Sequence, residues 1–463
     1  MHFLIIGGSD AGISAGLRAH ELDPTCEITL VLADDYPNFS ICGLPFFLSG
    51  ETPDWHALAH RTEFPGIRLI PNHTAEIIDP VRKAVTIRSS GGERRELSYD
   101  KLLIGTGARP VHPEIEGSDL PGVFPLHTME DSFAFHRYLE ERKPKSAVIV
   151  GAGYIGLEMA DALVHRGIAV TLASRTETVL ATVDSSFGKR VETELRTHGV
   201  EVCNRVEVRS IGRDGDHLVV AGTQDFLAAA DLVLVAVGVQ PNGELGATAG
   251  ISTGMKGALR VDLFMQTNVA DIYAAGDCVE TWHRQLNRYT YLPLGTTSHK
   301  QGRIAAENAI GGQREFEGSL GTQVVKIFDL VSARTGLRDR EAREAGFCPL
   351  TVEKTVWDHK AYYPGTKELH LRITGDCHSG QLLGAQLLGH KNSEVSKRVD
   401  VFATALFHGM NVESLNDLDL SYTPPLSSPW DPVQMAAQAW QAETIQTRER
   451  YKHVAECWRG KVG

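Results

Sequence analysis

AVIVGAGYIGLE, residues 147–158, decides the fold. Its first four residues are apolar and predict a buried strand, and a helical pattern follows the glycines. The Gly-x-Gly-x-x-Gly between them lets the backbone approach a pyrophosphate, while the helix N-terminus supplies a positive potential. We therefore predict a dinucleotide-binding unit, whose cofactor contacts come from Gly151, Gly153, Tyr154, Ile155 and Gly156.

The next strand of this unit, residues 169–172, is followed by Arg175 rather than by an acid. An acid at this place binds the 2′-hydroxyl of NAD, whereas an arginine suits the 2′-phosphate of NADP. We expect NADPH as the reductant, with NADH as the alternative if Arg175 is only a surface residue. A buried strand over residues 231–237 closes the unit and adds Gly238 to the expected cofactor site.

A second glycine turn lies near the N-terminus, after an apolar strand over residues 3–8 and before a helical pattern that runs to about Leu22. Ser9 stands where the middle glycine is usual, and a small residue still admits a pyrophosphate. The strand over residues 27–32 is followed by two acids, either of which, or neither, binds a ribose hydroxyl. The expected contacts here are Gly7, Ser9, Asp10, Ala11, Gly12, Asp34 and Asp35.

Two further strands are followed by small residues, which allow the backbone to approach a cofactor closely. They follow strands expected over residues 99–104 and 271–275. A helix expected over residues 296–308 begins beside them and offers its positive end. Two dinucleotide units in one chain indicate two nucleotides, with electrons passing between them. The contacts expected at these ends are Thr106, Gly107, Arg109, Gly276, Asp277 and Thr296.

Size and composition limit the classes of protein to consider. A length of 463 residues is enough for about three domains. The net charge of −12, from 46 basic and 58 acidic residues, argues against nucleic acid or an anionic membrane as a partner. The N-terminus runs straight into a strand and no run of about 18 apolar residues occurs, so we expect neither a signal peptide nor a membrane span.

The seven cysteines are scattered, odd in number and without a Cys-x-x-Cys pair. This pattern predicts neither a metal site nor a disulfide framework, and a cytoplasmic location is the simplest. Cys42, within NFSICGLPFF (residues 38–47), is the candidate for chemistry. We expect it near the N-terminus of a helix, where the dipole favours a thiolate that attacks a disulfide, peroxide or polysulfide. Taken alone, a single cysteine is more often a small buried apolar residue.

From about Val324 the pattern changes to that of an α+β domain without a phosphate-binding turn. Strands are expected over residues 369–373 and 382–388, and an amphipathic segment over residues 394–408. Tyr422 stands in a rigid, proline-containing loop before a helix that starts at about residue 432.

Together these motifs resemble the pyridine nucleotide-disulfide oxidoreductases, flavoproteins with two dinucleotide-binding domains, over essentially the whole chain. The single-cysteine branch looks closest: coenzyme A-disulfide reductases, NADH oxidases, NADH peroxidases and NAD(P)H-dependent polysulfide reductases. The branch with a Cys-x₄-Cys pair is excluded, because Cys42 has no cysteine at that spacing. The motifs that carry the resemblance are residues 42–45 (CGLP), 105–107 (GTG), 151–156 (GAGYIG), 274–277 (AAGD) and 422–425 (YTPP).

The resemblance implies an α/β fold with two Rossmann-like domains, one for FAD and one for NAD(P), and a C-terminal α+β dimerisation domain of a homodimer. Cys42 would lie beside the flavin. The implied boundaries are residues 1–113 and 242–322 for the FAD-binding domain, 114–241 for the NAD(P)H-binding domain and 323–463 for the dimerisation domain.

The resemblance also implies a mechanism, in which electrons pass from NADPH through FAD to a mixed disulfide on Cys42. The released thiolate attacks a sulfur of the substrate. Tyr422 and Tyr363, or its neighbour Tyr362, would act across the dimer as candidate donors to the leaving thiolate. Arg18 would help to hold an anionic substrate. His299 and Lys300, near the start of the helix expected over residues 296–308, are further candidates for this role, with solvated surface side chains as the alternative.

Some residues depart from the family pattern. Asp10 stands where the oxidases and peroxidases carry a histidine, and a carboxylate there repels a thiolate unless it is protonated or turned away. This favours a small disulfide or polysulfide of the coenzyme A disulfide type over peroxide or oxygen. Asn38 replaces a common serine and no lysine lies near Asn72, so other small disulfides and persulfides stay open.

Two other functions remain as alternatives. One is an NAD(P)H oxidase or peroxidase that uses a Cys42 sulfenic acid. The other is a flavin-bound electron carrier or regulatory protein that acts on a protein partner.

Overall fold

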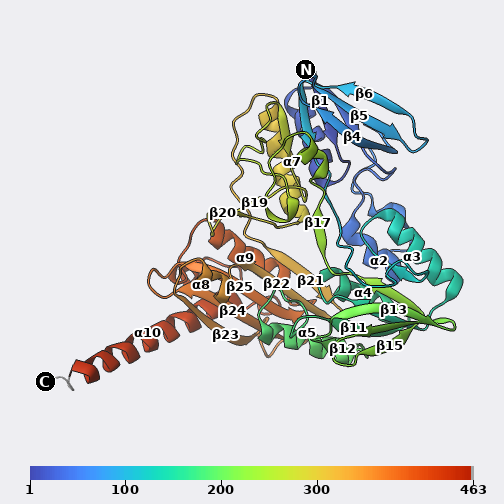
Figure 1. The fold of residues 1–463 in the computed structure, drawn as a ribbon. Coiled ribbons are helices and arrows are strands. Elements are labelled where there is room, and N and C mark those ends of the chain that lie inside the picture. The colour runs from blue at the N-terminus through green and yellow to red at the C-terminus, as the bar shows by residue number, and fades with distance from the viewer. Residues whose placement is uncertain (460–463) are drawn as a thin grey trace. The chain divides into compact units, whose positions relative to one another are not determined.

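The computed structural model describes residues 1–459 and divides into two compact units (Figure 1). The first unit comprises Met1–Arg175, Val200–His283 and Asn287–Ser319. The second comprises Thr176–Gly199, Arg284–Leu286 and the chain from Leu320 onward. Residues 460–463, which belong to the expected dimerisation domain, lie outside the described residues.

The first unit contains two five-stranded parallel sheets with matching strand orders. One runs β18-β7-β1-β2-β3, and the other runs β9-β16-β10-β11-β12. Their central strands β1, β7, β10 and β16 are almost continuously apolar, as parallel strands covered on both faces must be. The bounds are β1 His2–Ile6, β2 Glu27–Val31, β3 Ile67–Ile70, β7 Lys101–Ile104, β18 Ile272–Ala274, β9 Val123–Phe124, β10 Ser146–Val150, β11 Ala169–Ser174, β12 Glu201–Asn204 and β16 Leu232–Val235.

Each parallel sheet is accompanied by a three-stranded antiparallel sheet, β4-β5-β6 after β3 and β13-β14-β15 after β12. A pair of short strands, β8 and β17, joins the segments that leave and re-enter the N-terminal part. The bounds are β4 His73–Asp79, β5 Ala84–Ser89, β6 Arg94–Ser98, β13 Val208–Asp214, β14 His217–Gly222, β15 Leu227–Ala230, β8 Ala108–Pro110, β17 Val239–Pro241, β19 Thr281–His283 and β20 Arg288–Thr290.

The helices of the first unit follow the glycine turns or pack beside them. Helix α1 follows β1 and packs against α7, while α4 follows β10 and packs against α2. The bounds are α1 Asp10–Leu22, α2 Leu44–Ser49, α3 Met129–Arg142, α4 Tyr154–His165, α6 Glu244–Thr248 and α7 Gly295–Ala309.

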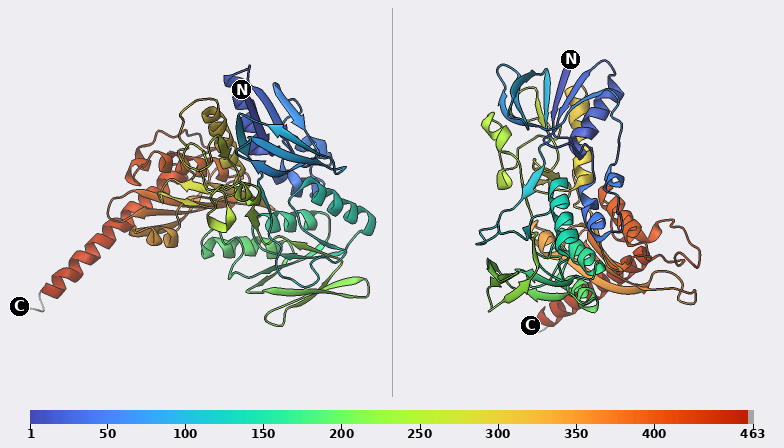
Figure 2. Two further views of the ribbon diagram at one scale, coloured as in Figure 1. Left: turned by 45° about the horizontal axis from the view of Figure 1, so that its top comes forward. Right: turned by 90° about the vertical axis from the view of Figure 1, so that its right-hand side faces the viewer.

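The second unit is built on an antiparallel sheet of order β21-β22-β25-β24-β23. The orange and red segments of Figure 2 show this part of the chain from two further sides. Helix α9 packs on β22 and β25, and α10 packs on β23 and β24, around a core that includes Phe402, Leu387 and Trp440. The bounds are β21 Gln323–Ile327, β22 Leu330–Gly336, β23 Pro349–Trp357, β24 Glu368–Asp376, β25 Leu382–His390, α5 Ser185–Thr197, α8 Asp339–Glu344, α9 Val395–Phe407 and α10 Pro432–Arg459.

The expected elements are present, most within one or two residues of their expected ends. The expected strand over residues 231–237 is too long, because β16 ends at Val235 and the chain turns through Gly238, whose φ is +108°. That conformation suits glycine and ends a strand. Among the described residues, no helix is both long and apolar enough to cross a membrane.

Candidate active site

The two glycine turns of the first unit have the same backbone geometry. Gly7 and Gly151 have φ of +112° and +113°. A Cβ added to Gly7 would lie 2.0 Å from the carbonyl oxygen of Gly105, and one added to Gly151 would lie 2.3 Å from that of Ala236. Only glycine combines this φ with such a close approach of a neighbouring strand. The equivalence indicates that both turns perform the same task.

The last glycine of each turn allows the helix to pack close to the preceding strand. The middle position of each turn leaves room for a ligand. A Cβ on Gly12 or Gly156 would lie 1.9 Å from the first glycine's carbonyl oxygen. A Cβ on Gly153 would meet no atom within 4 Å, and Ser9 caps α1 without a side-chain hydrogen bond. Both helix N-termini therefore present backbone N–H groups to an anion that can approach closely, which fits the pyrophosphates of FAD and NAD(P)H.

Close packing of α1 on α7 brings Asp10 to His299. A Cβ on Gly302 would lie only 2.1 Å from the carbonyl oxygen of Ala11, so the two helices touch through backbone. The Nε2 of His299 lies 3.2 Å from the Oδ1 of Asp10, and its Nδ1 lies 2.7 Å from the hydroxyl of Ser14. The hydrogen bond to Asp10 raises the pKa of His299, so the pair holds a proton to higher pH.

Cys42 lies in the 3₁₀ turn Ile41–Gly43, immediately before α2. The residue is exposed to solvent, yet enough protein surrounds its sulfur that desolvation is the largest cause of a raised thiol pKa. The charges of Glu158, Asp10 and Asp277 add to this effect, in that order. These carboxylates come from the start of α4, the start of α1 and the end of β18, so Cys42 lies within the electrostatic reach of both nucleotide turns.

The expected position of Cys42 is confirmed, but the expected preference for a thiolate is wrong for this arrangement. Helix α2 has only six residues, and Pro45 in its first turn has no N–H to offer. A helix this short with a missing donor supplies a weak positive potential. Burial and three carboxylates outweigh it, so the cysteine is held as a thiol unless those negative charges are compensated.

Asp277 follows β18 and faces the start of α7. Its Oδ1 accepts a hydrogen bond of 3.0 Å from the hydroxyl of Ser298. Burial raises the pKa of Asp277 to about 6, with a further contribution from Asp10 that opposes the effect of Ser298. The backbone N–H of Gly276 donates to the side-chain oxygen of Gln301 at 2.9 Å. The Gly-Asp corner is therefore fixed to α7, beside the helix start at Thr296.

The expected contacts at Thr106 and Arg109 have protein partners in the structure. The hydroxyl of Thr106 donates to the carbonyl oxygen of Asn242 at 2.6 Å. The Arg109 guanidinium donates to the Asn242 side chain at 2.9 Å and forms an ion pair with Glu244. Gly107 has a φ of +67°, and its carbonyl oxygen accepts from the N–H of Asn242 at 2.9 Å. These contacts tie the turn to the returning chain.

The charged candidates differ in how they are engaged. Arg18 is paired with Glu307 at 2.9 Å and Glu21 at 3.1 Å, so its charge is locally compensated. Lys300 and Arg175 are exposed, the latter directly after β11. Of the two acids after β2, Asp34 accepts a hydrogen bond from the N–H of Tyr36, and Asp35 is exposed.

The candidate tyrosines belong to the second unit, where two loops bring them together. Tyr363 and Tyr422 are 41% and 44% exposed. Their loops are joined by a hydrogen bond of 3.3 Å from the N–H of Lys360 to the carbonyl oxygen of Pro424. Buried Arg398 fastens both loops, donating to the carbonyl oxygens of Asp358 at 2.8 Å and Leu426 at 3.2 Å.

Two features of the site were not foreseen from the sequence. Glu158, two residues after the last glycine of the second turn, is the strongest charge acting on Cys42. Its signal in the sequence is an acid directly after the first turn of the helix that follows the glycines. The pairing of Asp10 with His299 joins positions 289 residues apart and needed the packing of α1 on α7.

Comparison with known proteins identifies the family to which this geometry belongs. The family model described as pyridine nucleotide-disulphide oxidoreductase matches residues 1–302, and that of the family's dimerisation domain matches residues 322–432. The chain belongs to the pyridine nucleotide-disulphide oxidoreductase family. The resemblance and the expected fold class are thereby confirmed.

Relatives in this family cover nearly the whole chain. A Pyrococcus furiosus protein named NAD(P)H sulfur oxidoreductase (CoA-dependent) is 36% identical over 438 residues, covering 94% of this chain and 98% of that protein. The NAD(P)H coenzyme A polysulfide/persulfide reductase of Pyrococcus horikoshii is 34% identical, covering 94% and 97%. The solved structure of an NAD-dependent persulfide reductase from A. fulgidus matches with a TM-score of 0.91 at 35% identity, covering 98% of this chain and 84% of that one.

Membership in the pyridine nucleotide-disulphide oxidoreductase family has direct consequences. The chain is an oxidoreductase, and the family implies binding of FAD and NAD(P)H. The glycine turns, the open helix N-termini and the Gly276-Asp277 corner fit these cofactors. The dimerisation domain indicates a homodimer.

Proposed function

We propose that the chain is an FAD-dependent NAD(P)H oxidoreductase that reduces the sulfur–sulfur bond of a small disulfide, persulfide or polysulfide of the coenzyme A type, through Cys42. One observation carries the proposal: the Cys42 sulfur lies within reach of charges from both nucleotide-binding turns. The names of the relatives, which specify sulfur, polysulfide, persulfide and coenzyme A, support this class of substrate.

In the proposed reaction, the thiolate of Cys42 attacks one sulfur of the substrate. The substrate's sulfur–sulfur bond breaks, a new bond to Cys42 forms, and the leaving thiolate takes a proton. Two electrons then cleave the mixed disulfide, regenerate the Cys42 thiolate and release the second half of the substrate as a thiolate, which takes up a proton. The turn from Gly7 to Gly12 and Asp277 would hold FAD, whose chemistry would be to pass electrons from the pyridine nucleotide to this disulfide.

Asp10 and His299 are proposed to control the charge near Cys42 and to supply a proton there. Asp10 alone raises the Cys42 pKa, but protonated His299 balances its charge at 3.2 Å. His299 also holds a proton that a leaving thiolate needs. Tyr363 and Tyr422 remain the proposed donors across the dimer, and Lys300 with Arg18 the proposed anchors for an anionic substrate.

We propose NADPH as the preferred reductant, bound at Gly151, Gly153, Tyr154, Ile155 and Gly156 with Gly238. Exposed Arg175 follows β11, where it suits a 2′-phosphate. Replacing Arg175 with Ala should raise the KM for NADPH about tenfold or more and leave the KM for NADH nearly unchanged. A wild-type enzyme that prefers NADH strongly would contradict this assignment without touching the role of Cys42.

One experiment tests the reaction itself. The purified protein is reduced anaerobically with NADPH or NADH, and reoxidation is followed after adding coenzyme A disulfide, coenzyme A persulfide, polysulfide, glutathione disulfide, peroxide or oxygen. We expect the fastest reoxidation with a coenzyme A sulfur compound, and its loss in Cys42→Ser. Rapid, Cys42-dependent turnover with oxygen or peroxide alone would favour an oxidase or peroxidase. Reoxidation by none of them, with a stable reduced flavin, would favour an electron carrier.

The domain limits stated from the resemblance also stand as a proposal: residues 1–113 and 242–322 for FAD, 114–241 for NAD(P)H and 323–463 for dimerisation. The repeated strand order of the two parallel sheets supports a division between them.

A further inference from the structure

Two cysteines of the second unit meet at the open end of a strand pair, Cys348 just before β23 and Cys377 just after β24. Pro349 and Asp376 are partners in the antiparallel register, which places the two cysteines opposite each other. The N–H of Cys377 donates to the carbonyl oxygen of Cys348 at 2.8 Å. The N–H of Cys348 donates to the Asp376 carboxylate at 2.9 Å. The backbone of both cysteines is therefore held in place by the sheet.

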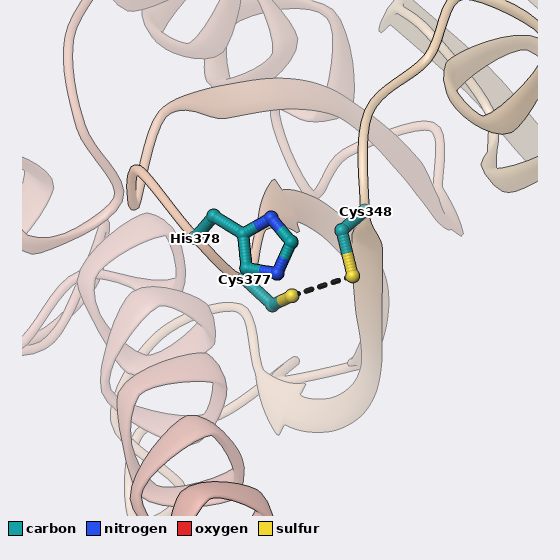
Figure 3. A group of neighbouring side chains, drawn as sticks. All are labelled: Cys348, Cys377 and His378. Atoms are coloured by element: carbon teal, nitrogen blue, oxygen red, sulfur yellow. Dashed lines mark hydrogen bonds between the residues drawn. The ribbon is translucent and has the colours of Figure 1, made fainter.

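The two sulfur atoms point at each other (Figure 3) and lie 2.6 Å apart. A disulfide bond is about 2.05 Å long, so a small rotation of either side chain completes it. Cys348 is exposed and can be reached by a reagent in solution. Burial and the neighbouring sulfur raise the pKa of Cys377 to about 11, which keeps Cys377 as the thiol that reacts second.

We propose that Cys348 and Cys377 form a reversible disulfide by exchange with a low-molecular-weight disulfide. The Cys348 thiolate attacks one sulfur of the reagent RSSR and releases RS⁻. Cys377 then attacks the Cys348 sulfur of the mixed disulfide and releases the second RS⁻, and the two protons of the protein thiols pass to the two leaving groups. The net reaction oxidises two protein thiols and reduces one RSSR to two RSH.

His378 completes the cluster, because one ring nitrogen lies within 4.8 Å of both sulfur atoms. This position suits it to accept a thiol proton during the exchange. Two cysteines and a histidine also suit a soft cation such as Zn²⁺. At a zinc–sulfur distance of about 2.3 Å, however, tetrahedral geometry separates two ligand sulfurs by about 3.8 Å. The sulfur separation of 2.6 Å therefore favours a disulfide over a shared metal.

The proposed Cys348–Cys377 disulfide would lie at the edge of the antiparallel sheet. β23 is the edge strand, and Cys348 immediately precedes it. A bond to Cys377 would add a covalent restraint between the start of this edge strand and the end of β24, which reduction would remove.

Peptide mapping of the full-length protein tests the proposal. The reduced, desalted protein is incubated without oxygen in glutathione disulfide, blocked with an alkylating agent and cleaved with trypsin. We expect one peptide pair, residues 344–354 joined to residues 373–391, that separates on adding dithiothreitol. Cys348→Ser and Cys377→Ser should both lose the pair, and Cys377→Ser should instead carry glutathione on Cys348, the cysteine that reacts first. Cys203→Ser, a control outside the cluster, should keep it.

His378→Asn distinguishes the disulfide from a metal site. The disulfide needs only the two sulfurs, so the linked peptides should still form, although more slowly. The proposal is overturned if Cys348 and Cys377 stay fully alkylatable while Cys42 has exchanged with glutathione in the same sample. It is also overturned if the protein binds one Zn²⁺ that requires all three residues and is not displaced by glutathione disulfide. Exchange at Cys42 is read from its own peptide, so failure here leaves the proposed function untouched.

Discussion

At the scale of single residues, the reactivity of Cys42 depends on negative charge. After burial, the negative charges of three carboxylates raise the pKa of its thiol, and the short helix that follows it offers little compensation. Glu158 is the strongest of these charges and Asp10 the second. The protonation of the residues around the sulfur therefore sets how much thiolate is present.

The first prediction concerns these carboxylates. Glu158→Gln should lower the pKa of the Cys42 thiol, and by more than Asp10→Asn does, because removing a nearby negative charge stabilises the thiolate. The rate of Cys42 alkylation by iodoacetamide, measured against pH by mass spectrometry, gives the pKa. Asp161→Asn, one turn further along α4, is the matched control and should have no effect. Equal alkylation midpoints in all four proteins would refute the assignment.

The second prediction concerns pH and the Asp10–His299 pair. The folded-state pKa of His299 is raised, so the pair's contribution to stability is present below the unfolded value of about 6.5 and is lost as pH rises through the folded value. Because the His299 side chain is about half exposed, the contribution is small. The difference in urea midpoint between wild type and His299→Asn should shrink from pH 5.5 to pH 9. A difference that grows with pH would contradict the pairing.

At the scale of elements, different glycines within one nucleotide-binding turn are required for different reasons, some for folding and some for ligand binding. Gly156 is needed because the helix and strand touch there, whereas Gly153 faces open space. Within this turn, the fold therefore constrains Gly156, whereas the ligand constrains Gly153.

The third prediction uses this difference. Gly156→Ala should destabilise the protein by about 1–3 kcal/mol, because its Cβ would lie 1.9 Å from the carbonyl oxygen of Gly151. Gly153→Ala should leave stability within about 0.5 kcal/mol of wild type and raise the KM for NAD(P)H, since a methyl group enters the space of the pyrophosphate. Denaturant unfolding and steady-state kinetics measure the two effects. A Gly153→Ala protein with normal nucleotide kinetics would argue against nucleotide binding at this turn.

At the scale of the whole molecule, a homodimer allows one subunit to complete the site of the other. The paired loops that carry Tyr363 and Tyr422 are exposed and are held rigidly by Arg398. Such a surface is suited to a defined position against another subunit.

The fourth prediction tests this arrangement with mixed dimers. Cys42→Ser and Tyr422→Phe subunits, each with low activity as homodimers, are unfolded together and refolded at equal amounts. If Tyr422 acts across the dimer, one site of each heterodimer contains both native residues, and random pairing restores about a quarter of wild-type activity. Native mass spectrometry confirms that heterodimers are present. No restoration despite abundant heterodimers would place Tyr422 in the site of its own subunit, or outside any site.

Local patterns predicted the central elements of both dinucleotide units. Apolar runs and glycine spacing located β1, β2, β7 and β18 in one parallel sheet and β10, β11 and β16 in the other, because buried parallel strands have strong local signals. The outer strands β3, β9 and β12 and the antiparallel sheets of the first unit were not predicted. The end of β16 was misjudged, since a single glycine's φ decides where that strand stops. The placement of Cys42 before a helix was also predictable, but its charge environment was not.

The sequence by itself determined that this protein has two dinucleotide turns, one cysteine of the family's redox motif and an α+β C-terminal domain, since each depends on residues that are neighbours in the chain. The tertiary structure alone decided that Glu158 and Asp10 act on Cys42, that His299 pairs with Asp10, and that Cys348 faces Cys377. Electrostatic and sulfur–sulfur interactions depend on distance in space, and helix packing and strand register set those distances.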